Sequence, residues 1–420
     1  MAIEPRFLRP APQELGHYLR PNRNDHRVLL QLLSENRLNI SGLVLDPCLW
    51  SRHEELAREA RANRLEVILD TRSVELSTAG GFARSGISEL PWAGSSPHDR
   101  DLSEATIALI AEQIAEFAVN RSCSAVLAPT HFIERGNDEW LHLDRLLTEA
   151  LRGELDRVSA RRMPIYYPLI LHSSVLRDDM SRLRIKRVLS HLPIDALWLR
   201  VHPFGTNSAG PSALSRYIHG ARDFHDLGLP IVGERTGTIG LPLLAFGVVG
   251  GIESGITYGE GFDIGPYRRV EEGNGFLPPP RIYLQQLECF LSRRLASSLF
   301  DHRGTRSIFG CQDVACCPRG ISDTIRDPRR HFVVRRASEV HSLSVVPQAI
   351  RATVYMDRML RPASDRMVTA IRAVPELDTH RERLDSWRAT LSVLLEQDRE
   401  MAVTHSAIPQ GHRMERRLGA

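Results

Sequence analysis

Residues Leu65–Asp70 read LEVILD, a short apolar run that ends in an acidic residue. A run of this length is typical of a strand that is buried on both faces of a parallel sheet. Similar runs recur along the chain and alternate with longer segments that have helical spacing. We expect strands at Gly42–Asp46, Leu65–Asp70, Ser124–Pro129, Ile165–Leu171, Ala196–Val201, Pro230–Glu234, Ile252–Thr257 and Thr305–Phe309.

The segments between these runs predict helices at Ser103–Asn120, Glu139–Ser159, Ser174–His191, Ala213–Leu227 and Tyr283–Phe300. Strands and helices in strict alternation predict an α/β fold, and eight such units favour a (β/α)8 TIM barrel over an open doubly wound sheet. We expect an N-terminal arm with one helix, Asp25–Glu35, over residues 1–40 and the barrel with its cysteine-rich loop over 41–345. A C-terminal helical extension over 346–402 and a basic, disordered tail over 403–420 complete the prediction.

The composition of the 420 residues excludes several classes of protein. No apolar run is long enough to span a membrane, and the polar, proline-broken N-terminus lacks the apolar segment of a signal peptide. We therefore expect a cytoplasmic protein whose cysteines stay reduced. Lys186 is the only lysine and lies in a polar helical segment, which excludes lysine-dependent phosphate-loop and Schiff-base chemistry.

Positive charge is concentrated toward the C-terminus. The net charge is only +3, but residues 281–372 contain 16 arginines against eight acidic residues. Such an asymmetry indicates either a basic face for phosphate groups or an ordinary solvated surface rich in arginine.

Three of the six cysteines lie close together in Ser307–His331, which reads SIFGCQDVACCPRGISDTIRDPRRH. Cys311, Cys316 and Cys317 precede a histidine, and zinc takes four such ligands in a closed tetrahedral site. The spacing matches none of the common zinc-finger patterns. Buried thiols without a metal and a redox pair are the alternatives to a structural zinc.

Polar residues, most of them ionisable, follow the predicted strands, where the mouth of a barrel holds its chemistry. They are Asp46, Asp70, Arg72, His131, His172, Arg200, His202, Glu234, Arg235, Glu253 and Thr257. The long loop Ser73–Arg100 and the glycine-rich segment Gly233–Gly265 should shape the same mouth. Backbone amides at glycines such as Gly233 suit binding of a phosphate or a flat base, although tight packing explains the glycines equally well.

The last predicted helix, Pro375–Ala402, has leucines seven residues apart at Leu377, Leu384 and Leu391. This spacing is typical of a short coiled-coil seam. The seam packs either onto its own domain or onto a second copy in a homodimer.

A barrel followed by a cysteine-rich metal loop and a helical tail resembles the tRNA-guanine transglycosylase family, whose members exchange a guanine in nucleic acid for a 7-deazaguanine. The segment RRHFVVRRASEVHSLSVVPQAIRATVYM is similar to the family helix that follows the zinc loop. By this resemblance Cys311, Cys316 and Cys317 are zinc ligands. The fourth is His341, or alternatively His331.

The resemblance also assigns roles at the mouth. ILDTRSVELSTAGGF places Asp70 where the family has the aspartate of its D-S-G-G-F motif. GGIESGITYGEGFD has no aspartate at the place of the family's nucleophile, so Glu253 and Glu260 compete for that role. We predict acid–base catalysis by Asp70 and substrate binding by Arg72, His172, His202, Glu234 and Gly233.

The resemblance implies a nucleic-acid substrate, tRNA or DNA, and a small deazaguanine-type base. Two other hypotheses remain open. A metal-dependent barrel hydrolase or lyase, acting on a small phosphorylated or nucleoside-like substrate, would use His131, His172, His202 and Glu234. A non-catalytic barrel that binds nucleic acid would keep only the metal loop and the basic face.

Overall fold

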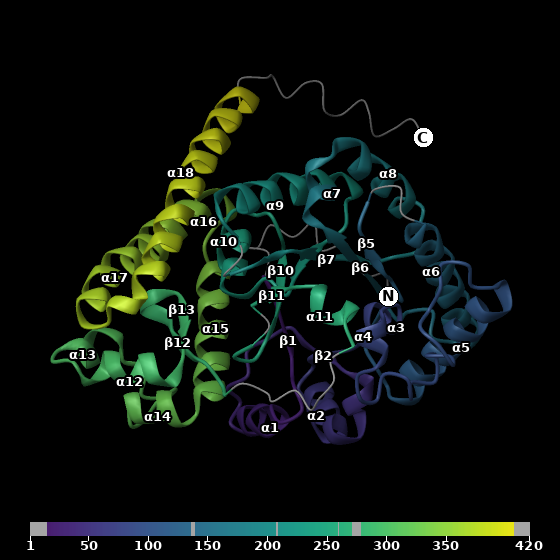
Figure 1. The fold of residues 1–420 in the computed structure, drawn as a ribbon, viewed down its shortest axis with the longest axis horizontal. Coiled ribbons are helices and arrows are strands. Elements are labelled where there is room, and N and C mark those ends of the chain that lie inside the picture. Colours follow the sequence, from purple (N-terminus) through teal and green to yellow (C-terminus); the bar gives the residue numbers. More distant parts are fainter. Residues whose placement is uncertain (1–14, 136–138, 207–208, 259, 271–278, 407–420) are drawn as a thin grey trace.

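The computed structural model describes residues 15–406, except 136–138, 207–208, 259 and 271–278. A closed barrel of parallel strands lies inside a layer of helices (Figure 1). In order around the barrel the eight strands are β1 (Gly16–Arg20), β2 (Gly42–Leu45), β3 (Glu66–Leu69), β4 (Ala125–Leu127), β6 (Ile165–His172), β7 (Ala196–His202), β9 (Ile231–Glu234) and β10 (Gly251–Gly255). Strand β10 pairs with β1 and closes the ring, which confirms the predicted (β/α)8 barrel.

Two of the predicted elements are wrong, at opposite ends of the barrel. The region expected to be an N-terminal arm contains the first strand, β1, which pairs with both β2 and β10. The expected eighth strand, Thr305–Phe309, is instead a short helix, α13. This run, TRSIF, has only two apolar residues, and Thr305 and Phe309 are its buried residues. So short a segment fits one turn of helix as well as a strand.

Helices cover the outside of the barrel because their apolar faces pack onto its strands. Ser103 caps α5 by accepting a hydrogen bond from the Thr106 backbone N–H, as its position before an apolar periodic segment predicts. None of the helices in the described ranges combines the length and apolar character needed to cross a bilayer. The helices of the barrel region are α1 (His26–Ser34), α2 (Trp50–Ala62), α3 (Ser73–Leu76), α4 (Ala79–Phe82), α5 (Glu104–Asn120), α6 (Trp140–Arg157), α7 (Ser173–Arg177), α8 (Asp179–Leu189), α9 (Pro211–Asp223), α10 (Gly240–Ala245) and α11 (Gly265–Arg268), with short 3-10 turns η2 (Pro47–Leu49), η3 (Phe224–Leu227) and η4 (Gly237–Ile239).

Short strands extend the barrel at its carboxyl end. Strand β5 (Phe132–Ile133) follows β4 and pairs with β6. Strands β8 (Phe204–Gly205) and β11 (Gly261–Phe262) form a small antiparallel pair of their own. This pair lies after β7 and β10 in the chain and therefore on the same side as the mouth.

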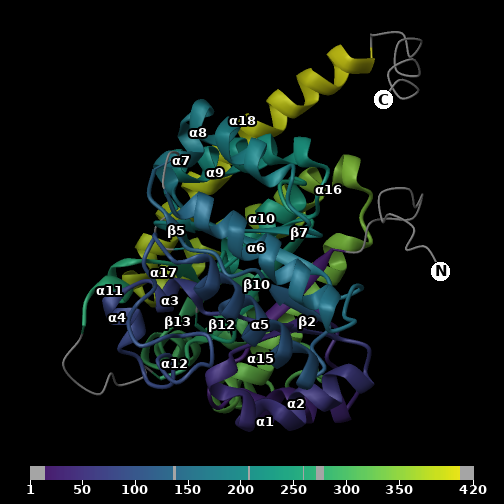
Figure 2. The ribbon, with the colours of Figure 1, turned by 90° about the vertical axis from the view of Figure 1, so that its right-hand side faces the viewer.

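A C-terminal unit follows the barrel and packs against it (Figures 1 and 2). The predicted helix Tyr283–Phe300 is wrong over its first half, which forms a hairpin of β12 (Ile282–Leu284) and β13 (Cys289–Leu291). Besides this hairpin, the C-terminal unit contains η5 (Gln285–Leu287), α12 (Arg293–Asp301), α13 (Thr305–Phe309), α14 (Ile321–Arg326), α15 (Pro328–Ser344), α16 (Gln348–Tyr355), the π-helical η6 (Met356–Leu360), α17 (Arg361–Ala373), η7 (Pro375–Leu377) and α18 (Asp378–Ser406).

The leucine seam of α18 faces its own chain. Leu377, Leu384 and Leu391 are fully buried, together with Trp387, whose Nε1–H donates to the Ala209 carbonyl oxygen. The homodimer through this helix stays a prediction, and the seam that suggested it is already used within the chain. The predicted basic tail lies outside the described residues from position 407 onward.

The lower half of the barrel interior is apolar and close-packed. Trp198 lies 5.0 Å from the ring of Tyr18 and stacks on Tyr166 at 5.8 Å between ring centroids. Val44, Ile68, Ala125, Leu127, Ala196 and Val232 complete this layer. It closes the amino end of the barrel, as the filled interiors of such barrels require.

Candidate functional site

Charged side chains form the next layer of the barrel interior, directly above the apolar one. Side chains alternate between the two faces of a strand, so the residue two positions on from an interior residue also points inward. The residues two positions beyond Tyr18, Ile68, Trp198 and Val232 are Arg20, Asp70, Arg200 and Glu234. Glu253 joins them from β10, where it lies opposite Glu234 of β9.

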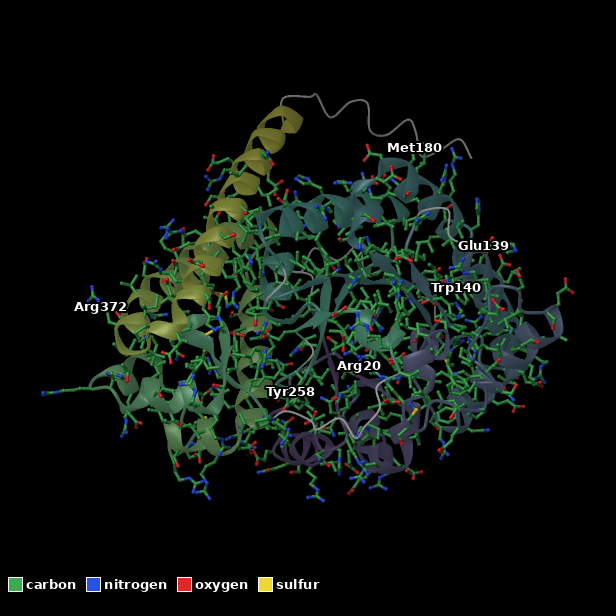
Figure 3. The ribbon with its side chains drawn as sticks, in the orientation of Figure 1. Arg20, Glu139, Trp140, Met180, Tyr258 and Arg372 are labelled. Atoms are coloured by element: carbon green, nitrogen blue, oxygen red, sulfur yellow. The ribbon has the colours of Figure 1, made fainter. Side chains whose placement is uncertain are left out.

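Arg20 is the centre of this layer and lies in the interior of the barrel (Figure 3). Its Nη2 and Nε atoms lie 2.6 Å from Glu234 Oε1 and 3.0 Å from Glu253 Oε1. Its Nη1 donates to Oδ2 of Asp70. The side chains of Glu234 and Glu253 are completely buried, and that of Arg20 is 7% exposed. One guanidinium therefore holds three carboxylates from three other strands.

Two further arginines surround this centre. Arg200 donates to Oε1 of Glu234, the oxygen that Arg20 also contacts. The guanidinium of Arg72 lies 3.8 Å from Asp70, and its backbone N–H donates to Asp70 Oδ1 at 3.0 Å. We call Arg20, Arg72, Arg200, Asp70, Glu234 and Glu253 the mouth cluster.

Asp70 is ionised in this surrounding. Burial acts to raise its pKa, because a carboxylate loses its hydration. Arg20, Arg72 and Arg200 together outweigh burial and bring the pKa well below its usual value. A carboxylate held in this state stabilises positive charge, but it is a weak proton acceptor and does not serve as a general acid at neutral pH.

The backbone at three strand ends adopts the left-handed conformation without glycine. The φ angles of Arg72, Arg235 and Thr257 are 59°, 54° and 62°. Arg235 donates its N–H to Oε2 of Glu253 at 3.0 Å, so this conformation positions the second carboxylate oxygen. Such conformations cost free energy and occur often at functional sites.

An aromatic cluster covers the mouth. Phe262 of β11 lies with its ring 5.3 Å from the Arg200 guanidinium, and Phe132 and Tyr267 pack beside it. Helix α11 approaches α4 closely, since a Cβ at Gly80 would lie 2.0 Å from the Arg269 carbonyl oxygen. Beside this cover Arg20 and Asp70 are 6% and 7% exposed.

The histidines proposed for a catalytic metal do not gather. His172 and His202 are neighbours at the rim, with ring centroids 5.7 Å apart. The Nδ1 atom of His172 is 2.7 Å from Ser174 Oγ, and that of His202 accepts the backbone N–H of Ile264. His131 lies apart from the mouth, with its Nδ1 2.5 Å from an oxygen of Asp144.

Two other predicted residues also lie away from Arg20. Glu260 accepts hydrogen bonds from Thr206 Oγ1 at 3.0 Å and Thr238 Oγ1 at 2.7 Å, and so joins the loops around β8 and β9. A Cβ at Gly233 would face Thr236 and Tyr217 in the helical layer. It lies on the outer face of β9, and its role in substrate binding stays a prediction.

The second candidate site lies in the C-terminal unit, where Cys311, Cys316, Cys317 and His331 converge. Their ligand atoms all lie within 4.8 Å of one another, and no other group of this kind occurs among the described residues. The Sγ atoms of Cys316 and Cys317 are 3.7 Å apart, and His331 Nδ1 lies 3.5 Å and 3.3 Å from them. This Cys3His cluster is able to bind a metal ion.

The surroundings of the Cys3His cluster orient its ligands. His331 Nε2 lies 3.1 Å from the Tyr283 carbonyl oxygen, so Nε2–H donates there and Nδ1 keeps its lone pair for a metal. The Asp313 carbonyl oxygen accepts the backbone N–H groups of Cys316 and Cys317 and folds the adjacent cysteines into one turn. Hydrogen bonds from Cys316 and Cys317 hold the pKa of Cys311 well below its usual value, whereas the hydrogen bond with Cys311 and burial raise the pKa of Cys317 to about 11.

The fourth member of the cluster is His331, the alternative in the sequence prediction. His341, the first choice for the fourth ligand in the sequence prediction, is exposed on α15 and lies outside the cluster. The two histidines are separated by almost three helical turns, and only the N-terminal end of α15 reaches the cysteine loop. Spacing along the sequence did not distinguish them.

Arg20 is the central residue that the sequence prediction missed. It lies in a segment, LGHYLRP, where Leu15 and Leu19 flank polar residues and prolines follow. The alternation Leu15, His17, Leu19 against Tyr18 and Arg20 was the available signal for a strand with two buried faces.

No protein-family model matches the chain, and no curated protein matches it. Several solved structures align over parts of it. An endo-1,4-beta-xylanase from Penicillium canescens is 10% identical with a TM-score of 0.37, over 58% of this chain and 83% of the xylanase. Thiamine phosphate pyrophosphorylase from Pyrococcus furiosus is 10% identical with a TM-score of 0.31, over 62% of this chain and 95% of that chain.

The carboxyl transferase domain of Rhizobium etli pyruvate carboxylase is 10% identical with a TM-score of 0.35, over 78% of this chain and 48% of that chain. At such identities and TM-scores these likenesses carry no argument about function. The assignment of the fold rests on the strand pairing itself.

Proposed function

We propose that the protein is a transglycosylase-type enzyme that exchanges a guanine-type base, related to 7-deazaguanine, in tRNA or DNA. The observation that carries the proposal is the convergence of Asp70, Glu234 and Glu253 at the carboxyl end of the barrel. Exchange at a glycosidic carbon requires a carboxylate that attacks or stabilises an oxocarbenium-like sugar, and a second group that transfers protons. The mouth cluster contains carboxylates for the first of these roles.

Glu253 is the nucleophile in this mechanism. Its carboxylate oxygen forms a bond to C1′ of the sugar as the bond from C1′ to the departing base breaks. The base leaves with the bonding electron pair and is protonated by water, because the low pKa of Asp70 excludes that carboxyl as the acid. A nitrogen of the incoming base then attacks C1′ and Glu253 leaves with the bonding electron pair. The hydroxide left by that water takes the N–H proton of the incoming base, while Asp70 stays ionised and stabilises the positive charge on the sugar.

The arginines of the mouth cluster govern when Glu253 is free to react. In the closed arrangement Arg20 donates to Glu253 and Glu234, so attack requires Arg20 to shift toward Glu234 or Asp70. Movement of the aromatic cover and entry of the substrate would supply that change. Glu260 has no part in this mechanism, since its carboxylate holds Thr206 and Thr238.

The charge of the C-terminal unit supports a nucleic-acid substrate. Exposed arginines on α12, α13 and α14 and on the adjoining loops include Arg293, Arg303, Arg306, Arg319 and Arg326. Guanidinium groups on one unit suit contacts with a phosphate backbone, which provides affinity without reading the sequence. The enzyme would then flip the target nucleotide into the mouth.

We propose zinc as the metal of the Cys3His cluster. Zinc–sulfur bonds of about 2.3 Å at tetrahedral angles place sulfur atoms about 3.8 Å apart. The observed 3.7 Å between the Sγ atoms of Cys316 and Cys317 fits this geometry. Four protein ligands leave no open position, so the zinc would hold the cysteine loop onto α15 rather than activate water.

Metal content tests the ligand set directly. We expect about one zinc per chain by elemental analysis of the purified protein. The metal should be lost in Cys316→Ser/Cys317→Ser and in His331→Ala but retained in the matched variant His341→Ala. Retention of zinc in His331→Ala together with loss in His341→Ala would contradict the assignment.

Base exchange tests the function. The wild type should incorporate labelled guanine or a 7-deazaguanine into tRNA or DNA, and Glu253→Gln should lower that rate by at least about a hundredfold. Glu55→Gln is the control, because Glu55 is 65% exposed on α2 and its removal should leave the rate unchanged. An equal rate in Glu253→Gln and the wild type would overturn the role of Glu253.

The buried ion pairs of Glu234 and Glu253 with arginines favour a second candidate, a non-catalytic barrel that binds nucleic acid. A mouth cluster with a purely structural role would show the same buried ion pairs. Binding of tRNA or DNA without base exchange by the wild type would support this candidate over the first.

A further inference from the structure

A groove of about 620 Å³ lies beside the barrel, outside both candidate sites. Helices α7, α8, α9 and α18 form its walls, and they lie together in both views of the molecule (Figures 1 and 2). Polar and cationic side chains on these walls include Arg177, Arg182, Ser212, Arg216, His219 and Thr390.

Acidic side chains neutralise only part of the positive charge of this groove. Arg182 is paired with Asp179 at 2.6 Å and with Asp223 at 2.8 Å. Asp179 is the only acidic residue among the described residues of the walls, and its carboxylate is already paired with Arg182. Within the described ranges neither Arg177 nor Arg216 has an ion-pair partner, so two guanidinium groups from different helices remain for an anion.

The other donors in the groove suit a phosphate rather than a carboxylate. Hydroxyl groups of Ser212, Ser215 and Thr390 line the same space. Helix α9 begins at Pro211 without a side-chain cap, and its positive end adds to the field of Arg177 and Arg216. Arginine forks and hydroxyl donors together match the several oxygens of a phosphate group.

The groove opens toward the same end of the barrel as the mouth cluster. Helix α7 begins at Ser173, directly after His172 at the carboxyl end of β6. Helix α9 begins shortly after β8, which follows the carboxyl end of β7. In a (β/α)8 barrel these helix N-termini surround the mouth, so a ligand in the groove lies at its rim.

We propose that this groove binds a backbone phosphate of the nucleic acid, close to the nucleotide whose base enters the mouth. The inference rests on the proposed function for the identity of the ligand. Arg177 and His219 are exposed at the groove, which suits a chain that passes through it better than an enclosed small molecule. The groove thereby gives the substrate a second anchor, separate from the arginines of the C-terminal unit.

The test compares two double variants that remove the same charge. Arg177→Ala/Arg216→Ala removes the two unpaired arginines of the groove. Arg161→Ala/Arg162→Ala is the matched control, because both arginines are exposed in the loop before β6, at the opposite end of the barrel. The readout is the dissociation constant of a fluorescent single-stranded RNA or DNA oligonucleotide between about 50 and 200 mM salt.

We expect the groove variant to bind the oligonucleotide about tenfold more weakly. The slope of the logarithm of its binding constant against the logarithm of the salt concentration should become less steep by about one to two. The control variant should stay within about twofold of the wild type, and both should keep the wild-type melting temperature. Equal affinities for the groove and control variants would overturn the proposal. A nucleoside monophosphate or inorganic phosphate that requires Arg177 and Arg216, while the oligonucleotide does not, would also overturn it and assign a free phosphate compound to the groove.

A different measurement, the rate of base exchange, tests the proposed function. Absence of base exchange in the wild type, with oligonucleotide binding that depends on Arg177 and Arg216, would reject the exchange chemistry and keep the groove.

Discussion

Two clusters of ionisable side chains are buried in this protein, and the pKa values of their carboxyl groups shift in opposite directions. In the mouth cluster the pKa of Asp70 is lowered. In the C-terminal unit, Glu288 and Glu339 are buried with Arg336, and the pKa of both carboxyl groups is raised, to about 7 for Glu288. We call Tyr283, Glu288, Arg336, Glu339 and Tyr355 the hairpin cluster, since its members lie on or against the β12–β13 hairpin.

The balance of charges explains the difference. The mouth cluster has as many arginines as carboxylates, and Arg20 touches all three of them. The hairpin cluster has one arginine for two carboxylates, and the nearest ion pair joins Arg336 to Glu339 at 3.3 Å. Glu288 instead accepts a hydrogen bond from the Tyr355 hydroxyl at 2.8 Å. Burial disfavours an ionised carboxylate unless enough positive charge lies beside it.

The largest expected effect is the loss of the shared arginine. Arg20→Met should lower the free energy of unfolding by about 3 to 5 kcal/mol, because it leaves buried carboxylates without their common partner. Urea denaturation at neutral pH measures this loss. Arg58→Met is the control, since Arg58 is 65% exposed and its removal should cost less than about 0.5 kcal/mol. A loss below about 1 kcal/mol for Arg20→Met would show that the mouth cluster contributes little to stability.

The hairpin cluster should destabilise the protein as the pH rises. The folded pKa of Glu288, about 7, lies above its ordinary value of 4.5, so its favourable contribution is complete below pH 4.5 and is lost as the pH rises through 7. The decline should be roughly 3 kcal/mol and should disappear in Glu288→Gln. Unfolding free energies between pH 4.5 and pH 8 measure it, with Glu55→Gln as the control. A decline of the same size in Glu288→Gln would assign it to another group.

The contribution of the mouth cluster to the free energy of unfolding should show the opposite pH dependence, and the change should be smaller. The lowered pKa of Asp70 gives stability that is present above its ordinary value of 3.8 and is lost as the pH falls. Asp70→Asn should therefore cost about 2 kcal/mol at pH 7, typical for a hydrogen bond to a charged group, and less at pH 3. The comparison of wild type and variant at both pH values checks the sign. A cost that grows toward pH 3 would contradict an ionised Asp70.

The sequence predicted seven of the eight strands of the barrel because each is an apolar run with a polar end. It did not predict β1, whose outward and inward faces are both partly polar, with His17 on one and Arg20 on the other. It assigned Thr305–Phe309 to a strand, although this run is one turn of helix beside the cysteine loop. Short runs are the least reliable because a few apolar residues fit either element.

The candidate site was predicted in composition more than in arrangement. Asp70, Arg72, Glu234 and Glu253 were expected at strand ends, and the structure brings them together in one layer. Glu260 was expected beside them because it is near in sequence to Glu253, yet it holds the loops around Thr206 and Thr238. Nearness along the chain does not fix which way a loop turns at the end of a strand.

The sequence by itself determined the alternation of strands and helices, the closeness of Cys311, Cys316 and Cys317, and the excess of arginine in the C-terminal unit. These are local properties, set by periodicity, spacing and composition. Only the tertiary structure decided that Arg20 joins carboxylates from three other strands, and that His331 rather than His341 completes the cysteine cluster. Both depend on which faces of distant elements meet when the barrel closes and α15 packs, and that is fixed by burial across the whole fold.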